Sequence, residues 1–356
     1  MAGTPLHDVT DQDDRGQPRS TAASRPFVVL ILLLVTGCAP LWVVPSLTPL
    51  PFLLLNLAYM LLACVAAGLV LGATMVARRT RALDLSPEQR RWMLAAIITT
   101  GITLSHFQVF KQLVLPNRGF PLDPLIATIE QQLLFGRDAW EWSHMVFGGL
   151  APTLVLDTAY ALWLPIMFLF PAAIVVMVAD ARMRGRLIGT WVASWILIGS
   201  LAAWLLASAG PCYYNALVGT HPGFIDLHTV LGQLDAQAAQ YGLQVRALYF
   251  QDMLKMSQGG GLVFASGISA MPSMHVAMAT LFAIAGFKIS PRVGWAFAAY
   301  ALLIWIASIH LGWHYAADGI LGGVMMVTLW LLSGPVTALI LSGAQRRREG
   351  RRTLLS

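Results

Sequence analysis

The chain has 356 residues, of which 57% are hydrophobic and 11% charged, and its formal net charge is +6. With a mean hydropathy of +0.67, this composition excludes an ordinary soluble globular protein and predicts a polytopic membrane protein. The basic residues stand in short clusters between apolar runs, which excludes the continuous basic surface of a nucleic-acid-binding protein, so we expect no nucleic-acid partner.

Eight apolar runs are long enough to cross a bilayer, whose hydrocarbon core requires roughly 20 residues per helix. They cover residues 27–46, 51–76, 92–110, 151–178, 187–208, 273–289, 293–312 and 317–342. We therefore predict an all-α fold, a membrane bundle of about eight transmembrane helices. Amphipathic stretches in the two long loops, 111–150 and 210–272, predict further helices that lie in the membrane interface.

The same pattern divides the chain into five parts. They are a disordered tail over 1–24, accessory spans over 25–110, an interfacial loop over 111–150, a second helix bundle over 151–342 that carries the polar motifs described below, and a basic tail over 343–356. No internal repeat and no inverted pair of broken spans is present, which disfavours a secondary transporter.

Lysine and arginine are distributed unevenly between alternate loops of this topology. Of the 23 basic residues, 18 fall on one side, and the other side keeps only Lys111, Arg118, Arg137, Arg246 and Lys255. Because basic loops remain in the cytoplasm, we expect a multi-pass protein of a bacterial inner membrane. Both termini are predicted to be cytoplasmic, and the two long loops extracytoplasmic.

The three cysteines, Cys38, Cys64 and Cys212, follow no metal-ligand spacing and imply no disulfide framework. Cys38 has a second interpretation, because Val35-Thr36-Gly37-Cys38 resembles a bacterial lipoprotein cleavage box. Cleavage and lipidation there would convert the first span into a signal segment. The long leader contains four aspartates, which favours an uncleaved first span.

Histidines and a carboxylate stand at span boundaries in the last third of the chain. Pro272-Ser273-Met274-His275 begins one span, and His310, His314 and Asp318 surround the junction of the next two. An ionisable side chain within hydrocarbon is unfavourable by roughly 2.5 to 3.5 kcal/mol on insertion scales and is usually retained for function. In the predicted topology, three helix ends converge on the side of the long loops.

The spacing of these residues indicates a nucleophile and an anion site. His314 and Asp318 are four residues apart and so share one side of a helical turn. The carboxylate can accept a proton from one ring nitrogen and leave the other as a nucleophile. Pro272-Ser273 opens a helix, whose free amides and dipole bind phosphate. The Ser273 hydroxyl either caps this helix or contacts the ligand.

These residues resemble the motifs of the type 2 phosphatidic acid phosphatase superfamily, whose second motif reads Pro-Ser-x-His and whose third ends His-x-x-x-Asp. The chain looks most like the inositol phosphorylceramide synthase (aureobasidin-sensitive) branch, by Met271–His275 and by the His314-Tyr315 pair before Asp318. Gly210-Pro211-Cys212-Tyr213-Tyr214 looks like the degenerate first motif of that branch. The resemblance covers residues 210–325 most closely.

The resemblance implies that His314 attacks phosphorus to form a phosphohistidine, that Asp318 orients it, and that His275 protonates the departing oxygen. It implies no metal and no cofactor. The partners would be a membrane phospholipid donor and a lipid or water acceptor, and the oligomeric state stays open. Further residues expected to bind substrate are Ser273, His310, Tyr213, Tyr214, Asp157, Arg246 and Lys255.

Phosphatase members of the family hold phosphate with a Lys and an Arg in the first motif and an Arg six residues before the nucleophile. Here the latter position is Ser308, and the first motif offers Tyr213 and Tyr214. A compensating cation must come from a long loop, because the transition state is otherwise poorly stabilised. The candidates are Arg246, Lys255, Arg118 and Lys111. The lost arginines favour head-group transfer over hydrolysis, by family analogy.

Several alternatives stay open at the level of sequence. The protein could hydrolyse phosphatidic acid or a polyprenyl pyrophosphate, relay protons as a proton-coupled transporter, or bind lipid without catalysis. Three roles stay open for His310: it could bind a metal together with the motif residues, form a hydrogen bond to a neighbouring residue, or contact the substrate. Asp157 either lines the head-group pocket or makes an interhelical hydrogen bond.

Overall fold

The computed structural model describes residue 44 and residues 48–80, 85–257, 262–264 and 266–353. These residues form helices joined by loops, with no strand among them. The predicted span over 27–46, together with Cys38, lies outside the described residues apart from Val44.

Seven apolar helices build the bundle, and each matches one predicted span. They are α3 (Pro49–Arg78), α4 (Pro87–Val109), α7 (Leu150–Met177), α8 (Ala181–Ile196), α13 (Met274–Ile289), α14 (Pro291–His310) and α15 (Ala316–Thr353). In the described part of the chain, six helices are long and apolar enough to cross a membrane, and α13 is apolar but shorter. The prediction of a polytopic helix bundle is confirmed.

Two of these helices continue through irregular turns. A π-helical turn (Phe110–Val114) and a 3-10 turn (Leu115–Arg118) follow α4. A π-helical turn (Leu197–Ala202) and the short α9 (Ala203–Leu205) follow α8. Such π-helical turns are rare and occur often at functional sites.

Local sequence explains where the helices begin. Ser86 and Gln89 form a capping box at the start of α4, and Ser290 caps α14 by accepting a hydrogen bond from the Val293 amide. A proline occupies the first turn of both helices, where its missing N–H leaves no hydrogen bond unmade. These caps separate spans that a hydropathy profile alone would place only approximately.

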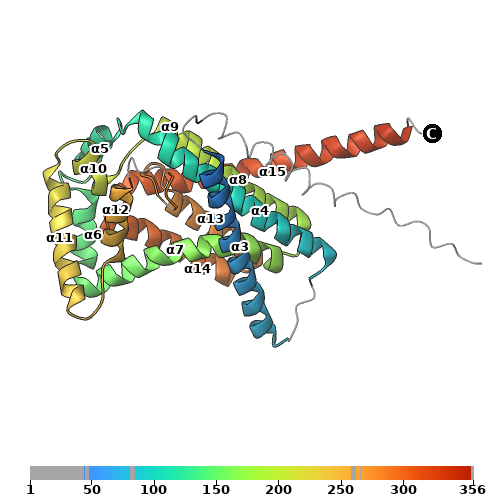
Figure 1. Ribbon diagram of the computed structural model, residues 1–356, viewed down its shortest axis with the longest axis horizontal. Helices are drawn as coiled ribbons and strands as arrows, with labels where there is room; N and C mark the ends of the chain where they lie inside the picture. The colour runs from blue at the N-terminus through green and yellow to red at the C-terminus, as the bar shows by residue number, and fades with distance from the viewer. Residues whose placement is uncertain (1–43, 45–47, 81–84, 258–261, 265, 354–356) are drawn as a thin grey trace, which may run out of the picture.

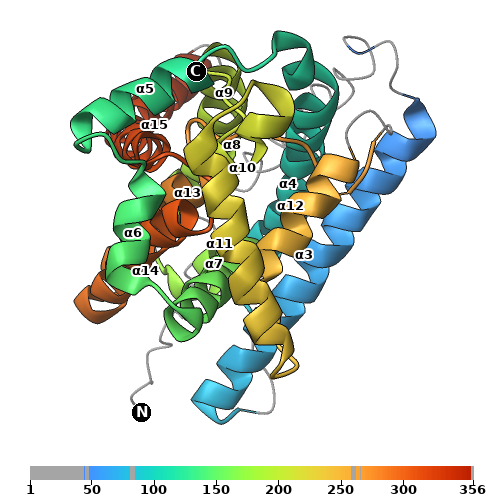
Figure 2. The ribbon, with the colours of Figure 1, turned by 90° about the vertical axis from the view of Figure 1, so that its left-hand side faces the viewer.

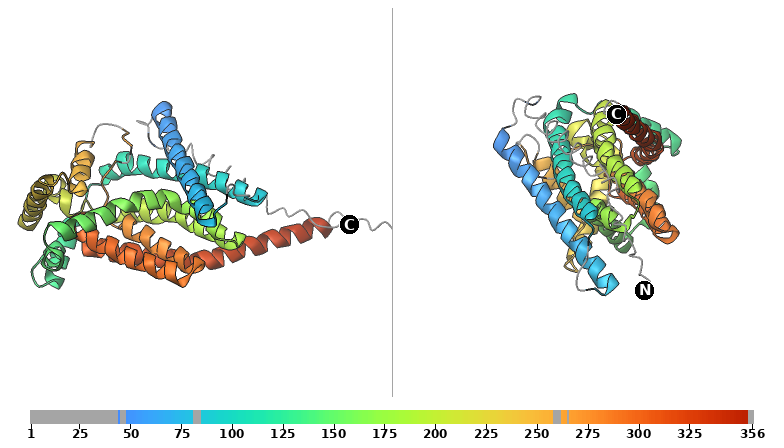
Figure 3. Two further views of the ribbon diagram at one scale, coloured as in Figure 1. Left: turned by 90° about the horizontal axis from the view of Figure 1, so that it is seen from below. Right: turned by 90° about the vertical axis from the view of Figure 1, so that its right-hand side faces the viewer.

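Helix α7 lies at the centre of the bundle, in contact with α3, α4, α8, α13 and α14 (Figures 1 and 3). Helix α13 packs against α14 and α15, so the last three apolar helices form a unit of their own. The start of α13 and the start of α15 therefore come close together.

Five further helices gather at one end of the bundle, called the loop end below (Figures 1 and 2). They come from the two long loops and are α5 (Asp123–Leu133), α6 (Ala139–Phe147), α10 (Pro211–Leu217), α11 (Pro222–Ala239) and α12 (Arg246–Met256). At the opposite end, α15 continues as a helix to Thr353, well beyond the predicted end of its span at residue 342. Its alanine, glutamine, glutamate and arginine residues are good helix formers.

Candidate active site

Three helix ends meet at the loop end and bring the predicted motifs together. The Ser273 amide donates to the Asp318 carbonyl at 3.0 Å, which joins the start of α13 to the start of α15. The amides of Trp313 and His314 donate to the Ser308 carbonyl at 2.9 and 3.2 Å, which folds the connecting loop back onto the end of α14. The two motifs thus belong to one site.

Two glycines permit this close approach. A Cβ atom on Gly322 would lie 2.4 Å from the Ser273 carbonyl oxygen, so a side chain there would separate α15 from α13. Gly210 has a φ of +87°, and a Cβ atom there would lie 2.6 Å from the Trp313 carbonyl oxygen. Glycine is required at both positions, by contact in the first case and by contact and backbone conformation in the second.

His314 and Asp318 form the hydrogen-bonded pair that their spacing predicts. Nδ1 of His314 lies 3.3 Å from Oδ2 of Asp318, which also accepts the Tyr315 amide at 3.1 Å. Asp318 is fully buried and His314 is only 5% exposed. The carboxylate fixes the proton on Nδ1, so Nε2 of His314 keeps its lone pair and can act as a nucleophile.

Ser273 serves as the N-cap of α13, because its hydroxyl accepts the Val276 amide at 3.4 Å. Its side chain is fully buried. Of the two roles open to this serine, the structure therefore gives it the helix cap. The start of α13, which is the positive end of its dipole, lies beside the start of α15, and a helix terminus of this kind favours a bound anion.

His275 lies across from His314, with 6.0 Å between the ring centroids. Its ring stacks on Tyr160 at 4.4 Å and packs against Trp163 at 4.1 Å. The indole N–H of Trp163 donates to the His275 carbonyl at 3.0 Å, which fixes the first turn of α13 against α7. Both imidazoles can therefore reach one phosphoryl group from different sides.

Aromatic side chains connect this site to the loop helices. Trp313 stacks on Tyr160 at 5.9 Å and meets Tyr213 edge to face at 6.5 Å. Tyr213 donates its hydroxyl proton to the Gln251 carbonyl at 3.2 Å. Burial raises the pKa of Tyr213, so its phenol stays protonated.

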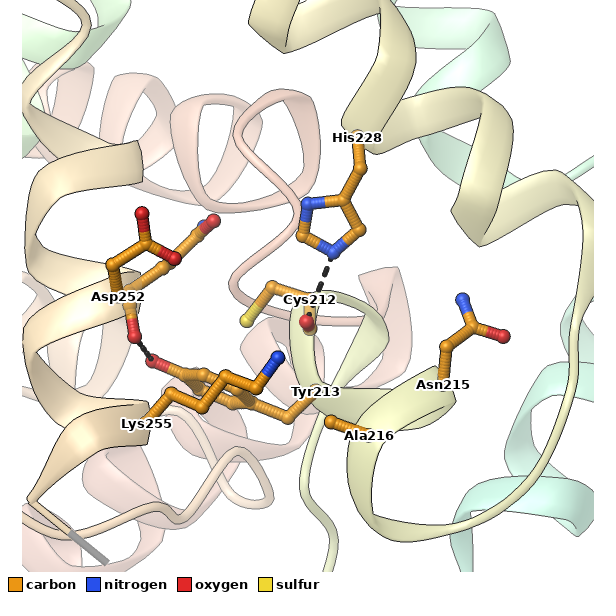
Figure 4. A pocket seen from close by; sticks show the side chains of 8 residues that line it. Cys212, Tyr213, Asn215, Ala216, His228, Asp252 and Lys255 are labelled. Carbon is orange, nitrogen blue, oxygen red and sulfur yellow. Dashed lines mark hydrogen bonds between the residues drawn. The ribbon is translucent and has the colours of Figure 1, made fainter.

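A cavity of about 280 Å³ adjoins Tyr213 (Figure 4). It is lined by Cys212, Tyr213, Asn215, Ala216, His228, Gln251, Asp252 and Lys255. Gln251 donates to the Leu311 carbonyl at 2.9 Å, and the Cys212 amide donates to the Gly312 carbonyl at 2.8 Å. The cavity thus borders the loop that carries His314, and two predicted substrate-binding residues, Tyr213 and Lys255, line it.

Several other predicted substrate-binding residues are engaged by distant parts of the chain. Both ring nitrogens of His310 lie within hydrogen-bonding distance of hydroxyls, those of Ser143 and Thr153, at 3.2 and 2.9 Å. Asp157 accepts the backbone amides of Arg246 and Ala247 at 3.0 and 2.8 Å. His310 thereby ties α14 to α6 and α7, and Asp157 caps α12 from within α7.

Tyr214 and Arg246 are likewise held by neighbouring side chains. Tyr214 packs edge to face against His221 and Phe224, each at 5.4 Å between ring centroids. The Arg246 guanidinium donates to the Thr158 hydroxyl at 3.2 Å. Neither residue has a contact with the two catalytic candidates His275 and His314 among the interactions of the described residues.

Two carboxylates of α5 hold the loops on either side of the site. Glu130 accepts the Ala316 amide at 2.7 Å and so caps α15. Asp123 accepts the amides of Ala209 and Gly210 at 2.8 and 2.9 Å and the Tyr315 hydroxyl at 3.1 Å. Burial raises the pKa of Asp123, and these hydrogen bonds oppose the shift.

Comparison with protein families identifies residues 125–332 as a match to the model described as the PAP2 superfamily. The chain belongs to the PAP2 superfamily. Neither the comparison with curated proteins nor the comparison with solved structures found a match. Members of the PAP2 superfamily are phosphatases or phosphotransferases, which makes lipid phosphate chemistry the kind of activity to consider.

The PAP2 match includes His275, His314 and Asp318 and begins within α5. Sequence reasoning had identified these three residues from their positions at helix ends. It missed Asp123, Glu130 and the indole of Trp163. A carboxylate in an amphipathic helix, or a tryptophan within an apolar span, belongs to no motif, and the roles of these residues follow only from contacts across the fold.

Proposed function

We propose that the protein transfers a phosphoryl head group between lipids through a phosphohistidine, in the manner of the inositol phosphorylceramide synthase-like branch of the PAP2 superfamily. One observation carries this proposal. The His314 imidazole is held through Nδ1 by Asp318 at 3.3 Å, and the His275 ring lies 6.0 Å away, centroid to centroid. The side chains that we assign as nucleophile, orienting carboxylate and proton donor therefore lie close together.

In the first half-reaction, Nε2 of His314 attacks phosphorus and forms a P–N bond while the bond from phosphorus to the donor-lipid oxygen breaks. Protonated His275 gives its proton to that leaving oxygen. In the second half-reaction, a hydroxyl of the acceptor attacks phosphorus, His275 takes the hydroxyl proton, and the P–N bond breaks. The enzyme returns to its starting state, and no metal or cofactor takes part in this scheme.

The burial of the nucleophile supports transfer to a lipid over transfer to water. His314 is 5% exposed, the rings of Tyr160 and Trp163 pack against His275, and Trp313, next to His314 in sequence, stacks on Tyr160. Excluding water protects a reactive intermediate from hydrolysis. A lipid hydroxyl that enters from the bilayer is then the favoured acceptor. We place this chemistry at the extracytoplasmic leaflet, as the distribution of basic residues indicates.

The decisive experiment uses the purified protein with phospholipids that carry a labelled phosphate, and with diacylglycerol and ceramide as acceptors. We expect a new labelled lipid, a labelled histidine after a rapid quench, and no effect of a chelator. Release of free labelled phosphate as the main product would instead identify a lipid phosphatase. Solute flux driven by a pH gradient in liposomes, without phosphate chemistry, would identify a transporter and overturn the proposal.

A further inference from the structure

The cavity beside Tyr213 is built from three loop helices, α10, α11 and α12, and it carries polar groups that the proposed chemistry does not use (Figure 4). Its volume of about 280 Å³ lies just below the range of roughly 300 to 1,000 Å³ for pockets that hold drug-sized ligands. A molecule the size of a lipid head group therefore suits it. Neither His275 nor His314 is among the described residues that line this cavity, so it is separate from the candidate active site.

Three groups of the cavity lining can accept hydrogen bonds. Gln251 donates through Nε2 to the Leu311 carbonyl, and its buried Oε1 has no hydrogen-bond partner among the described residues. Nε2 of His228 lies 3.0 Å from the Cys212 carbonyl and donates to it, so Nδ1 of the neutral ring keeps its lone pair. Asp252 adds an exposed carboxylate. Because buried polar groups are normally paired, Oε1 of Gln251 indicates that a donor from a ligand belongs here.

Two further groups of the lining can donate hydrogen bonds. Oδ1 of Asn215 accepts the His221 amide at 2.7 Å, so the side-chain nitrogen of Asn215 keeps both hydrogens for a ligand. Lys255 contributes an ammonium group, and it lies with Asp252 on α12, facing the same space (Figure 4). Among the ion pairs of the described residues, none involves Lys255 or Asp252. The cavity thus offers one unpaired cation and one unpaired anion.

We infer that this cavity binds a small zwitterion that carries a primary ammonium and an anionic group. The ammonium N–H groups pair with the Asp252 carboxylate and with Oε1 of Gln251. The anionic group pairs with the Lys255 ammonium and the Asn215 side-chain nitrogen. A ligand with a single charge leaves one of the two lining charges unmatched, and a neutral ligand gains fewer of the stronger, charge-assisted hydrogen bonds. The inference concerns binding alone and does not depend on the proposed function.

Backbone contacts place a ligand of this cavity next to the loop that carries His314. Gln251 donates to the Leu311 carbonyl at 2.9 Å, and the Cys212 amide donates to the Gly312 carbonyl at 2.8 Å. Both residues line the cavity. A free zwitterion in solution and the zwitterionic head group of a membrane lipid share the required chemistry, and the experiments below separate these two sources.

The first test measures binding of glycerophosphoethanolamine, a soluble zwitterion, to the full-length protein in detergent by isothermal titration calorimetry. Glycerol 3-phosphate lacks the ammonium group, and the ammonium group of glycerophosphocholine has no N–H. We expect both of these to bind at least about 10-fold more weakly, because each loses charge-assisted hydrogen bonds. Equal affinity for the three compounds, or no binding of glycerophosphoethanolamine, would overturn the inference.

Charge-removing variants locate the binding site. Asp252→Asn and Lys255→Met change exposed side chains, and each should raise the dissociation constant of glycerophosphoethanolamine about 10-fold or more. Asp226→Asn and Arg137→Met are matched controls that remove charges outside the cavity lining, and they should bind like the wild-type protein. Size-exclusion chromatography confirms that all four variants are folded. Wild-type affinity in Asp252→Asn and Lys255→Met would disprove the site.

Two further measurements identify the occupant and exclude the catalytic pocket. If a lipid head group occupies the cavity, phosphatidylethanolamine in phosphatidylglycerol nanodiscs competes with the soluble probe; if a free zwitterion does, the apparent affinity is the same with and without it. Either result supports zwitterion binding and identifies its source. His314→Gln should bind glycerophosphoethanolamine normally, and loss of binding in this variant would place the probe at the catalytic residues and refute a separate site. Turnover of lipid phosphates tests the proposed function independently.

Discussion

Asp318 acts on His314 through a single oxygen, Oδ2, which accepts both the imidazole N–H and the Tyr315 amide. Its other oxygen, Oδ1, has no hydrogen-bond partner among the described residues. In the proposed mechanism, the carboxylate fixes one tautomer of His314 and stabilises the charge that develops on the ring. An asparagine can occupy the same space but cannot do both.

We therefore expect Asp318→Asn to lower kcat by about 10⁴-fold, which is the effect of the corresponding change in a serine-protease triad. Head-group transfer by the purified variant measures this loss. Asp226→Asn, which changes an exposed aspartate of α11, serves as the control and should be fully active. Wild-type turnover by Asp318→Asn would contradict the orienting role of the carboxylate.

His275 and His314 can be distinguished by the leaving group. A nitrophenolate departs without a proton, so His275→Gln should retain much of its activity on a nitrophenyl phosphate ester while losing that on an alkyl phosphate. His314→Gln should lose both activities, because the nucleophile is absent. Steady-state rates with the two esters test this difference. Equal losses on both esters in His275→Gln would exclude its role as the proton donor.

Some contacts of single residues could not be predicted from the sequence. The cost of burying charge singled out the ionisable residues at helix ends, and the fold brings His275, His314 and Asp318 together. This cost did not indicate that His310 bonds Thr153, 157 positions away, or that Asp157 caps a helix 89 positions away. Such hydrogen-bond partners depend on packing between distant elements, and neither residue spacing nor hydropathy predicts them.

At the level of elements, α5 holds the loop that joins α14 to α15 and carries His314. Glu130 and Asp123 bind Ala316 and Tyr315 across 186 and 192 residues of sequence. The amphipathic pattern predicted the helix, and the structure adds that its two carboxylates fix the start of α15. These bonds hold the residues next to His314 and Asp318. The position of α5 therefore affects the geometry of the site.

Because Glu130 has a raised pKa, the contribution of this contact to stability depends on pH. Burial, together with the charges of Asp318 and Asp138, raises the pKa of Glu130 from 4.5 to about 7, although the Ala316 amide opposes the shift. Between these values the folded protein holds a proton that the unfolded chain releases. Stability therefore decreases as pH rises through this window, by at most about 1.4 kcal/mol per pH unit, and levels off above it.

Glu130→Gln keeps a carbonyl oxygen for the Ala316 amide and cannot ionise. We expect its unfolding temperature to match that of the wild-type protein near pH 4.5 and to exceed it near pH 8. Thermal unfolding in detergent across this range measures the difference, with Asp226→Asn as a control that should follow the wild-type curve. Parallel curves for Glu130→Gln and the wild-type protein would show that Glu130 does not titrate in this window.

At the scale of the whole molecule, the bundle was predictable because the bilayer fixes the length of each apolar helix. The order of packing was not, since every apolar span offers the same kind of surface to its neighbours. The central position of α7 and the pairing of α13 with both α14 and α15 depend on particular side chains and glycines. The site arises from that packing, at the end where the loop helices gather.

The distribution of basic residues predicts the orientation of the molecule in the membrane. Of the 23 basic residues, 18 lie on the predicted side of the termini, and basic loops stay in the cytoplasm. In a variant without Cys38, Cys64 and Cys212, we expect a membrane-impermeant maleimide to label Arg137→Cys in intact cells. Arg347→Cys should react only after the membrane is permeabilised. The reverse pattern would place His314 and its lipid substrate on the cytoplasmic side and refute extracytoplasmic catalysis.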